Sequence, residues 1–189
     1  MVVRACPPQI RDLVVTLAGT GLRLGEALAL RVEDVAIGAQ GRGTIRVRRA
    51  LKRDGSIGTP KSARSRRDVS LSRELAALLA ERISGKPRPA LVFPAPRGGF
   101  WHSGNLHQRY WQPSIASARR CLKHPPALPP KPRSGPRRKW RNDEVSTCEC
   151  PTRLHRAPRI HDLRHSHVSW LIEAGWDITR ISRRVGHES

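Results

Sequence analysis

The stretch "RIHDLRHSHVSW" (159–170) concentrates ionisable side chains at the start of a predicted helix. His161, Arg164 and His165 have the spacing i, i+3 and i+4, which places them on one side of the first helical turn. The N–H groups of that turn are unpaired and the helix dipole is positive there, so an anion is favoured. The structural alternative is that His161 caps the helix and Arg164 pairs with Asp162 or Glu26. From this stretch alone, that alternative is at least as well supported.

The charge of the whole chain favours an anionic partner. Lysine and arginine number 36 against 15 aspartates and glutamates, a formal net charge of +21. The guanidinium group stays charged and matches phosphate oxygens in a bidentate manner, so nucleic acid is the expected partner. A solvated basic surface is the alternative.

Length and hydropathy bound the class of protein. At 189 residues the chain fits one domain, 1–189. No run of apolar residues is long enough to span a membrane, and "MVVRACPPQI" lacks the apolar core of a secretory signal. We therefore expect a cytoplasmic protein with no membrane contact.

The four cysteines, Cys6, Cys121, Cys148 and Cys150, fit no standard zinc spacing. The "CEC" at 148–150 with His155 is the one candidate for a metal site, but paired C-x-x-C knuckles are absent. We therefore expect thiols without a disulfide, and no metal.

Apolar periodicity predicts mostly helices, with a few strands in the first half of the chain. Helices are expected over 8–19, after Leu22, after a cap at Ser72, and over 103–120. The segments 31–37, 44–50 and 67–72 are predicted to form short strands.

Residues 121–158 differ from the rest of the chain, because they hold eight of the sixteen prolines and a dense basic run. This composition predicts a flexible insertion that either contacts nucleic acid or is simply solvated.

Two helices are predicted for the last segment. In the first, Leu163, His167, Trp170, Leu171 and Ala174 share one face, which predicts a mostly buried helix. His167 is expected to be a hydrogen-bonded core residue, and Trp170 is expected in the core. Gly175 ends this helix, Asp177 caps the next, and Gly186 ends that one.

Three further segments join the "HDLRH" motif in a fixed order. "TGLRLGEALALRVEDV" places Arg23 at a helix start with Glu26 one turn later, "GTPKSARSRRDVSLS" places Lys61 before a basic strand, and "VGHES" places His187 after a helix. Together they resemble the catalytic domain of the tyrosine recombinase (phage integrase) family. The resemblance runs from about Thr16 to the last residue, interrupted by 121–158.

The resemblance implies a mainly α (α+β) fold, a helical catalytic domain with a small antiparallel sheet near the N-terminal part. It also implies transesterification at phosphodiesters of double-stranded DNA by a tyrosine hydroxyl, which leaves a covalent 3′-phosphotyrosyl link. No cofactor or metal is required, because cationic side chains stabilise the transition state.

The roles of individual residues follow from the same resemblance. Arg23 and Arg164 would hold the non-bridging oxygens, with a further hydrogen bond from His187. His161 would act as general base and Lys61 would protonate the leaving 5′-oxygen. Glu26 would orient the site through Arg23 or His161, and His165 either lines the site or packs in the helix. The basic run that includes Arg64, Arg66 and Arg67 would contact DNA.

The family's nucleophile has no counterpart in the printed sequence. The only tyrosine, Tyr110, lies in the wrong place in the order, and packing is its expected role. We therefore expect the chain to bind DNA without cutting it, and to be a monomer away from DNA. The alternatives are a non-catalytic basic nucleic-acid-binding protein and a topoisomerase with similar chemistry.

Overall fold

The structure is a computed structural model that describes residues 2–59, 66–121, 123–124, 148–151 and 153–186. Lys61, Arg64 and His187 lie outside these ranges, as does the segment 125–147 of the predicted insertion, so the predictions on them stay predictions. Within the described ranges, the helices are all too short or too polar to cross a membrane.

Helix α2 (Pro8–Thr20) lies at the centre of the fold, and the short α1 (Val2–Ala5) precedes it. Its apolar stripe, Ile10, Leu13, Val14 and Leu17, is fully buried, which confirms the predicted helix. It ends at Gly21 in the left-handed conformation, with φ of 68°. Helices α3, α4 and α7 all pack against α2, so this helix connects the N-terminal and C-terminal parts of the site described below.

The predicted antiparallel sheet is confirmed. Strands β1 (Val35–Ile37), β2 (Gly43–Val47) and β5 (Arg67–Leu71) pair in the order β1-β2-β5. A two-stranded hairpin, β3 (Ala50–Leu51) with β4 (Ile57–Gly58), leads from the sheet toward the segment that holds Lys61.

The strand predicted over 31–37 is shorter than expected. Residues Val32–Asp34 form a 3₁₀ turn, η1, because the Asp34 carboxylate accepts the N–H of Arg31 at 2.9 Å and tightens the chain there. A second short turn, η2 (Ala39–Gly41), joins β1 to β2.

Helices α3 (Leu24–Leu28) and α4 (Arg73–Ile83) flank the sheet in sequence. The predicted cap of α4 is present, since Ser72 Oγ accepts the N–H of Leu75 at 3.3 Å. Helix α4 contacts β1 and β2, where Leu75, Ala76 and Leu79 are buried.

The helix predicted over 103–120 is divided into three parts: α5 (Ser103–Leu106), a π-helical turn η4 (His107–Trp111) and α6 (Gln112–Ala118). Pro113 explains the wide turn, because it has no N–H to donate to the carbonyl four residues earlier. Tyr110 packs edge-on against Trp101 with ring centroids 5.1 Å apart, the packing role expected for it.

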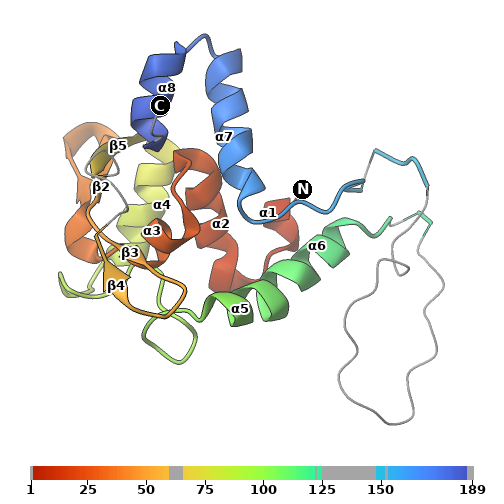
Figure 1. Cartoon of the computed structure of the whole chain (residues 1–189), viewed down its shortest axis with the longest axis horizontal. Helices are drawn as coiled ribbons and strands as arrows, with labels where there is room; N and C mark the ends of the chain where they lie inside the picture. The colour runs from red at the N-terminus through yellow and green to blue at the C-terminus, as the bar shows by residue number, and fades with distance from the viewer. Residues whose placement is uncertain (1, 60–65, 122, 125–147, 152, 187–189) are drawn as a thin grey trace.

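Helices α7 (Asp162–Glu173) and α8 (Ile178–Val185) stand side by side above α2 (Figure 1). The prediction that the first of them is mostly buried is wrong. Its buried residues are Arg164 and His167, whereas Trp170 is 53% exposed. The reason is that α7 packs on α2 through polar side chains. Arg164 and His167 hydrogen-bond to the carbonyls of Gly21 and Ala18 at the end of α2, and the apolar strip of α7 therefore faces outward.

The ends of α7 and α8 agree with the sequence. Gly175 follows α7 with φ of 77°, Asp177 accepts the N–H of Arg180 at 2.9 Å, and Gly186 ends α8 in the left-handed conformation. Ile181 and Val185 are buried, but Ile178, predicted on the same stripe, is 72% exposed.

Candidate functional site

A buried carboxylate organises the site. Glu26 is 2% exposed and accepts the backbone N–H of Arg23 at 2.9 Å and the Arg23 guanidinium at 3.0 Å. The Arg67 guanidinium donates to both of its oxygens, at 2.9 and 3.2 Å. Burial opposes ionisation of Glu26, but the hydrogen bonds and charges of the two arginines outweigh it and lower the pKa of the carboxyl below its ordinary value. The predicted link of Glu26 to Arg23 is therefore present.

Arg164 lies in the same cluster. It is 4% exposed, and its Nη1 donates to the carbonyl of Gly21 at 2.7 Å. Its Nη2 is buried and has no hydrogen-bond partner among the described residues. Burial and the positive charges of Arg23 and Arg67 lower the pKa of Arg164 to about 10, while Glu26 acts in the opposite direction. Arg164 thus remains charged at neutral pH, with one donor unused.

The end of α8 is held against this cluster by both of Glu26's partners. Arg23 Nη2 donates to the carbonyl of Gly186 at 2.8 Å, and Arg67 Nε donates to the carbonyl of Arg184 at 2.7 Å. These two bonds span more than a hundred residues of sequence. His187 follows Gly186 directly in the sequence but lies outside the described residues.

His161 and His165 stand one turn apart at the start of α7. Their rings meet edge to face with centroids 5.0 Å apart. Partial burial of the ring, together with the neighbouring His165 and Arg164, lowers the pKa of His161. The neutral imidazole, which is the form that accepts a proton, is therefore favoured.

The structural alternative for "HDLRH" is not supported. His161 occupies the N-cap position of α7 but makes no side-chain capping hydrogen bond. Asp162 pairs with Arg159 at 3.1 Å, and Glu26 forms its ion pairs with Arg23 and Arg67, so no direct ion pair of Arg164 with either acid is seen among the described residues. The side chains of His161 and Arg164 are therefore not committed to the roles that this alternative gave them.

His167 is the hydrogen-bonded core residue that the sequence predicts. Its Nδ1 lies 3.0 Å from the carbonyl of Ala18, and its Nε2 lies 3.0 Å from Nε of Arg184. Since Arg184 can only donate, Nε2 is the acceptor and Nδ1 carries the proton, which assigns the neutral tautomer. Arg184 also donates to the carbonyl and hydroxyl of Ser70 on β5, so this chain of contacts ties α2, α7, α8 and the sheet together.

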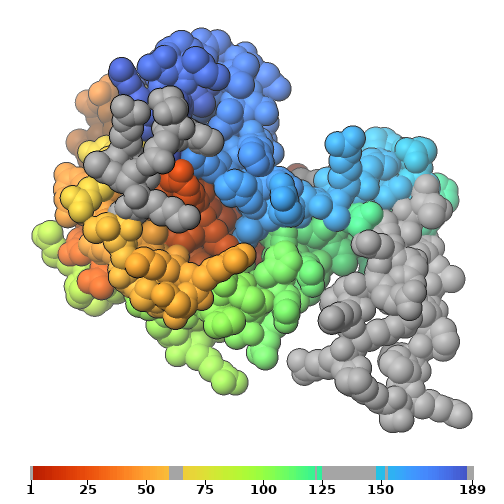
Figure 2. All heavy atoms as spheres, viewed as in Figure 1, coloured from red at the N-terminus to blue at the C-terminus, as the bar shows by residue number. Residues whose placement is uncertain are grey.

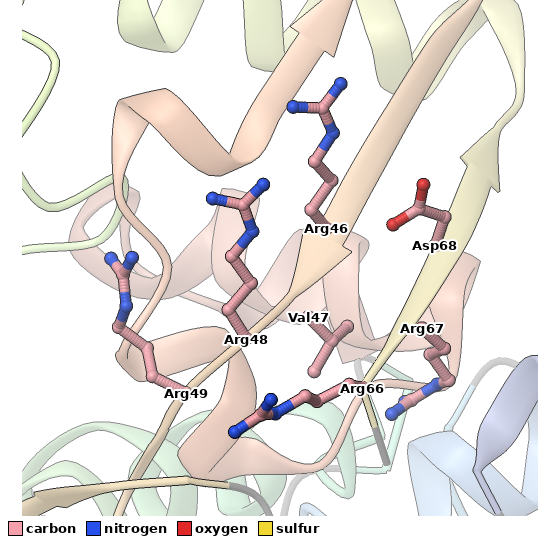
Figure 3. A pocket seen from close by; sticks show the side chains of 7 residues that line it. All are labelled: Arg46, Val47, Arg48, Arg49, Arg66, Arg67 and Asp68. Atoms are coloured by element: carbon pink, nitrogen blue, oxygen red, sulfur yellow. The ribbon is translucent and has the colours of Figure 1, made fainter. Parts of the chain in front are cut away.

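A basic hollow of about 850 Å³ opens over the sheet, lined by Arg46, Val47, Arg48, Arg49, Arg66, Arg67 and Asp68 (Figure 3). Arg46, Arg48 and Arg66 are exposed, and within the described ranges no ion pair or hydrogen bond of their side chains is seen. Arg49 is already paired with Glu33 and Asp34.

The prediction that Arg67 contacts DNA needs correction, whereas Arg66 remains a candidate. The two residues are consecutive and both line the hollow, but Arg66 is exposed and Arg67 is not. The Arg67 side chain is 6% exposed and is committed to Glu26 and to α8. Position in a basic run did not separate the two residues, because the partner of Arg67, Glu26, lies 41 residues away in sequence.

The structure thus brings together Arg23, Glu26 and Arg164, with His161 and His165 beside Arg164 on the same turn. Sequence reasoning missed the inward role of Arg67 and the part of Arg184. The sequence did contain a signal for the inward role of Arg67. Glu26 lies in an apolar helix, and a buried carboxylate requires hydrogen-bond donors. Three guanidinium groups around one carboxylate leave a surplus of positive charge, which suits an anion whose negative charge is shared by two oxygens.

Comparison with known proteins gives relatives by sequence and by fold. The chain is 26% identical over 171 residues to the integrase of Staphylococcus phage L54a, covering 89% of this chain and 41% of that protein. It is 23% identical over 196 residues to a putative prophage phiRv2 integrase of Mycobacterium tuberculosis, covering 42% of that protein. The chain therefore spans less than half the length of these relatives. No protein-family model matches it.

Solved structures show the same fold. The Tn1549 transposon integrase in complex with circular intermediate DNA superposes with a TM-score of 0.64 at 18% identity, over 96% of this chain and 52% of the other. The XerA recombinase gives a TM-score of 0.63 at 18% identity, over 100% of this chain and 52% of the other. The chain therefore has the fold of the tyrosine recombinase catalytic domain, and the family resemblance predicted from its motifs is confirmed.

Proposed function

We propose that this chain is the phosphodiester-binding part of a DNA breaking-and-rejoining enzyme of the tyrosine recombinase type, which acts in site-specific recombination or integration. One observation carries the proposal. The buried guanidinium of Arg164 keeps an unused donor next to Arg23, and Glu26 is the one acidic group that balances the cluster among the residues the structure describes. A buried donor without a partner costs free energy, and a phosphate oxygen would supply both the acceptor and the negative charge.

The proposed chemistry uses the cluster as a rigid anion holder. When a hydroxyl attacks phosphorus, negative charge builds up on the non-bridging oxygens, and donors already fixed in place stabilise that charge without reorganising. Arg164 is fixed by Gly21, and Arg23 is fixed by Glu26 and Gly186. Neutral His161 would accept the proton of the attacking hydroxyl, and Lys61 would donate one to the leaving oxygen, with a further hydrogen bond from His187.

The partner we propose is double-stranded DNA. A protein of similar fold supports this choice, since the Tn1549 integrase was solved in complex with circular intermediate DNA. In this chain the exposed Arg46, Arg48 and Arg66 lie over the sheet next to the cluster, and Arg66 adjoins Arg67 in sequence. The hollow they line would hold the DNA backbone on one side of the phosphate that reacts.

The attacking hydroxyl would come from a tyrosine, and the one tyrosine of residues 1–189 is Tyr110. Tyr110 is packed against Trp101, so we do not assign it this role. The 189-residue chain by itself should therefore bind duplexes and form no covalent adduct. We further propose that it acts in the cytoplasm and that it is a monomer in the absence of DNA.

The test is to join this chain to a C-terminal segment that supplies the tyrosine, and to trap covalent adducts on nicked duplexes of randomised sequence. Arg164→Ala should reduce adduct formation by roughly 10²-fold or more and leave duplex binding within a few-fold of the parent. Exposed Arg97 lies outside the cluster and the hollow, so Arg97→Ala is the matched control. Adduct formation by Arg164→Ala near the parent rate would contradict the proposal. Tight duplex binding with no adduct from the parent would instead favour the non-catalytic binder.

A further inference from the structure

Four metal-ligating side chains meet where the two ends of the 121–158 segment come together. Cys121 and His124 follow α6, and Cys148 and Cys150 precede the segment that leads into α7. Their ligand atoms, three Sγ and a ring nitrogen, all lie within 4.8 Å of one another. The Sγ atoms of Cys121 and Cys150 are 3.7 and 3.3 Å from Nδ1 of His124. None of the cysteines forms a disulfide.

The two sulfur–nitrogen distances are close to the edges of a zinc-centred tetrahedron, and the 4.8 Å limit of the whole set is about 1 Å wider, so the ligands would move inward on binding. Zinc binds sulfur at ~2.3 Å and imidazole nitrogen at ~2.0–2.1 Å, which puts neighbouring ligand atoms about 3.5–3.8 Å apart. Three thiolates and one imidazole form a set found in closed structural zinc sites. We propose that Cys121, His124, Cys148 and Cys150 bind one structural Zn²⁺ ion.

The surroundings hold both halves of this site in place. Cys121 is 1% exposed at the end of α6. On the other half, Arg153 is 6% exposed and its Nε donates to the carbonyl of Cys148 at 2.6 Å. The N–H of Leu154 donates to the carbonyl of Ala118 at 2.8 Å, which fixes the returning chain against the helix. Three thiolates with Zn²⁺ would carry a net charge of −1, and the positive charge of buried Arg153, held at the carbonyl of Cys148, would favour it.

The sequence pointed to a different histidine. "CEC" suggests His155, because it is close in sequence, yet the ring of His155 faces Glu149 at 3.9 Å and is absent from the cluster. The partner is His124, which has a C-x-x-H spacing to Cys121 and is separated from Cys148 by residues 125–147. The spacing fits no common zinc pattern because the second pair is C-x-C and the intervening segment is long.

The ion would join the two ends of the basic segment. The cluster lies at the far end of α6, where residues 148–151 and 153–158 project beyond the helical body (Figure 2). Residues 125–147, which lie between the two ligand pairs, contain six lysines and arginines against two acids. Zinc would fix both points at which this segment leaves the domain, and would do so independently of the phosphate site.

The experiment measures metal in the full 189-residue chain, purified with reductant and supplied with Zn²⁺ or Co²⁺. We expect one Zn²⁺ per chain by mass spectrometry, and thiolate-to-Co²⁺ charge-transfer bands together with the visible bands of tetrahedral cobalt. Cys150→Ser and His124→Ala should each lower zinc affinity by roughly 100-fold or more in a competition titration. His155→Ala and Cys6→Ser are the matched controls and should keep the parent affinity.

The proposal is overturned by a parent chain that binds less than about a tenth of an equivalent of zinc, or by a cobalt complex without thiolate bands. Equal zinc affinity in the parent and in Cys150→Ser would overturn it as well, as would loss of zinc on replacing His155. The cobalt spectrum of the parent decides the matter even where a variant fails to fold. A disulfide among these cysteines that persists in reductant and excludes metal would also refute it.

Discussion

Arg67 holds Glu26 with both terminal guanidinium nitrogens, at 2.9 and 3.2 Å, and so connects the sheet to the helix that carries Arg23. The same side chain reaches α8 through the carbonyl of Arg184. The residue that the sequence presents as one more surface arginine is therefore a central support of the site. Its removal should affect stability as well as function.

Arg67→Ala should lower the free energy of unfolding by about 3–5 kcal/mol, because it removes one of the two arginine side chains that donate hydrogen bonds to the buried Glu26 carboxylate. Arg66→Ala, one residue earlier and exposed, should change stability by less than about 0.5 kcal/mol. Urea unfolding of both variants checks this. Equal stability of the two variants would show that the pair contributes nothing.

Gly21 has a double constraint. Its φ is +68°, and an added Cβ would lie 2.7 Å from Cδ2 of His167. Gly21→Ala should therefore destabilise the protein by roughly 1–3 kcal/mol more than backbone strain alone does, and should displace the carbonyl that holds Arg164.

Gly85→Ala is the matched control for Gly21, since its φ is +71° and nothing lies within 4 Å of the added Cβ. The free energy of unfolding of this variant should fall by only about 1 kcal/mol, the cost of placing alanine in the left-handed region. Thermal unfolding of both variants gives the comparison. A loss in Gly21→Ala no greater than in Gly85→Ala would contradict the close packing of His167 on Gly21.

His167 predicts a pH dependence of stability. Burial, with the charge of Arg184 next in size, lowers the pKa of His167 from 6.5 to about 4 in the folded chain. The unfolded chain therefore binds more protons between these values, so the contribution of His167 is complete above pH 6.5 and is lost as the pH falls toward 4. The total loss is roughly 3 kcal/mol.

His167→Gln removes this titration and retains a donor and an acceptor, so its stability should fall less steeply between pH 6.5 and 4. His155→Gln, at an exposed histidine, is the control and should follow the parent. Chemical denaturation across this pH range provides the measurement. Parallel curves for the parent and His167→Gln would show that His167 is not held neutral.

The basic hollow predicts the salt dependence of duplex binding. Replacing Arg46, Arg48 and Arg66 with alanine should weaken binding and reduce the log–log salt slope by ~0.9 for each phosphate that the variant no longer neutralises. Alanine at exposed Arg4, Arg97 and Arg120 removes the same charge elsewhere and is the control. Fluorescence anisotropy over a salt series separates the two. Identical slopes for the two triple variants would place the DNA path on another surface.

The sequence predicts the fold well where one local signal decides the outcome. The helix over 8–19, the Ser72 and Asp177 caps, and Gly186 as a helix end all appear as expected. It fails where long-range pairing decides. Trp170 was predicted in the core from helical periodicity, but α7 docks through His167 and Arg164 because the carbonyls of Ala18 and Gly21 require donors.

The site shows the same division. The motifs identified Arg23, Glu26 and Arg164, whose positions follow from short spacings on helix starts. Arg67 and Arg184 could not be placed, because their partners lie 41 and 114 residues away in sequence. The cysteine–histidine cluster escaped prediction for the same reason, since its two halves are separated by a long segment.

The most direct measurement is the structure of this chain bound to duplex DNA. We predict a backbone phosphate whose oxygens lie within hydrogen-bond distance, about 2.7–3.2 Å, of guanidinium nitrogens of both Arg23 and Arg164, with His161 facing the phosphorus. The same complex should place neighbouring phosphates at Arg46, Arg48 or Arg66. Phosphates found only on surfaces remote from Arg23 and Arg164 would contradict the account.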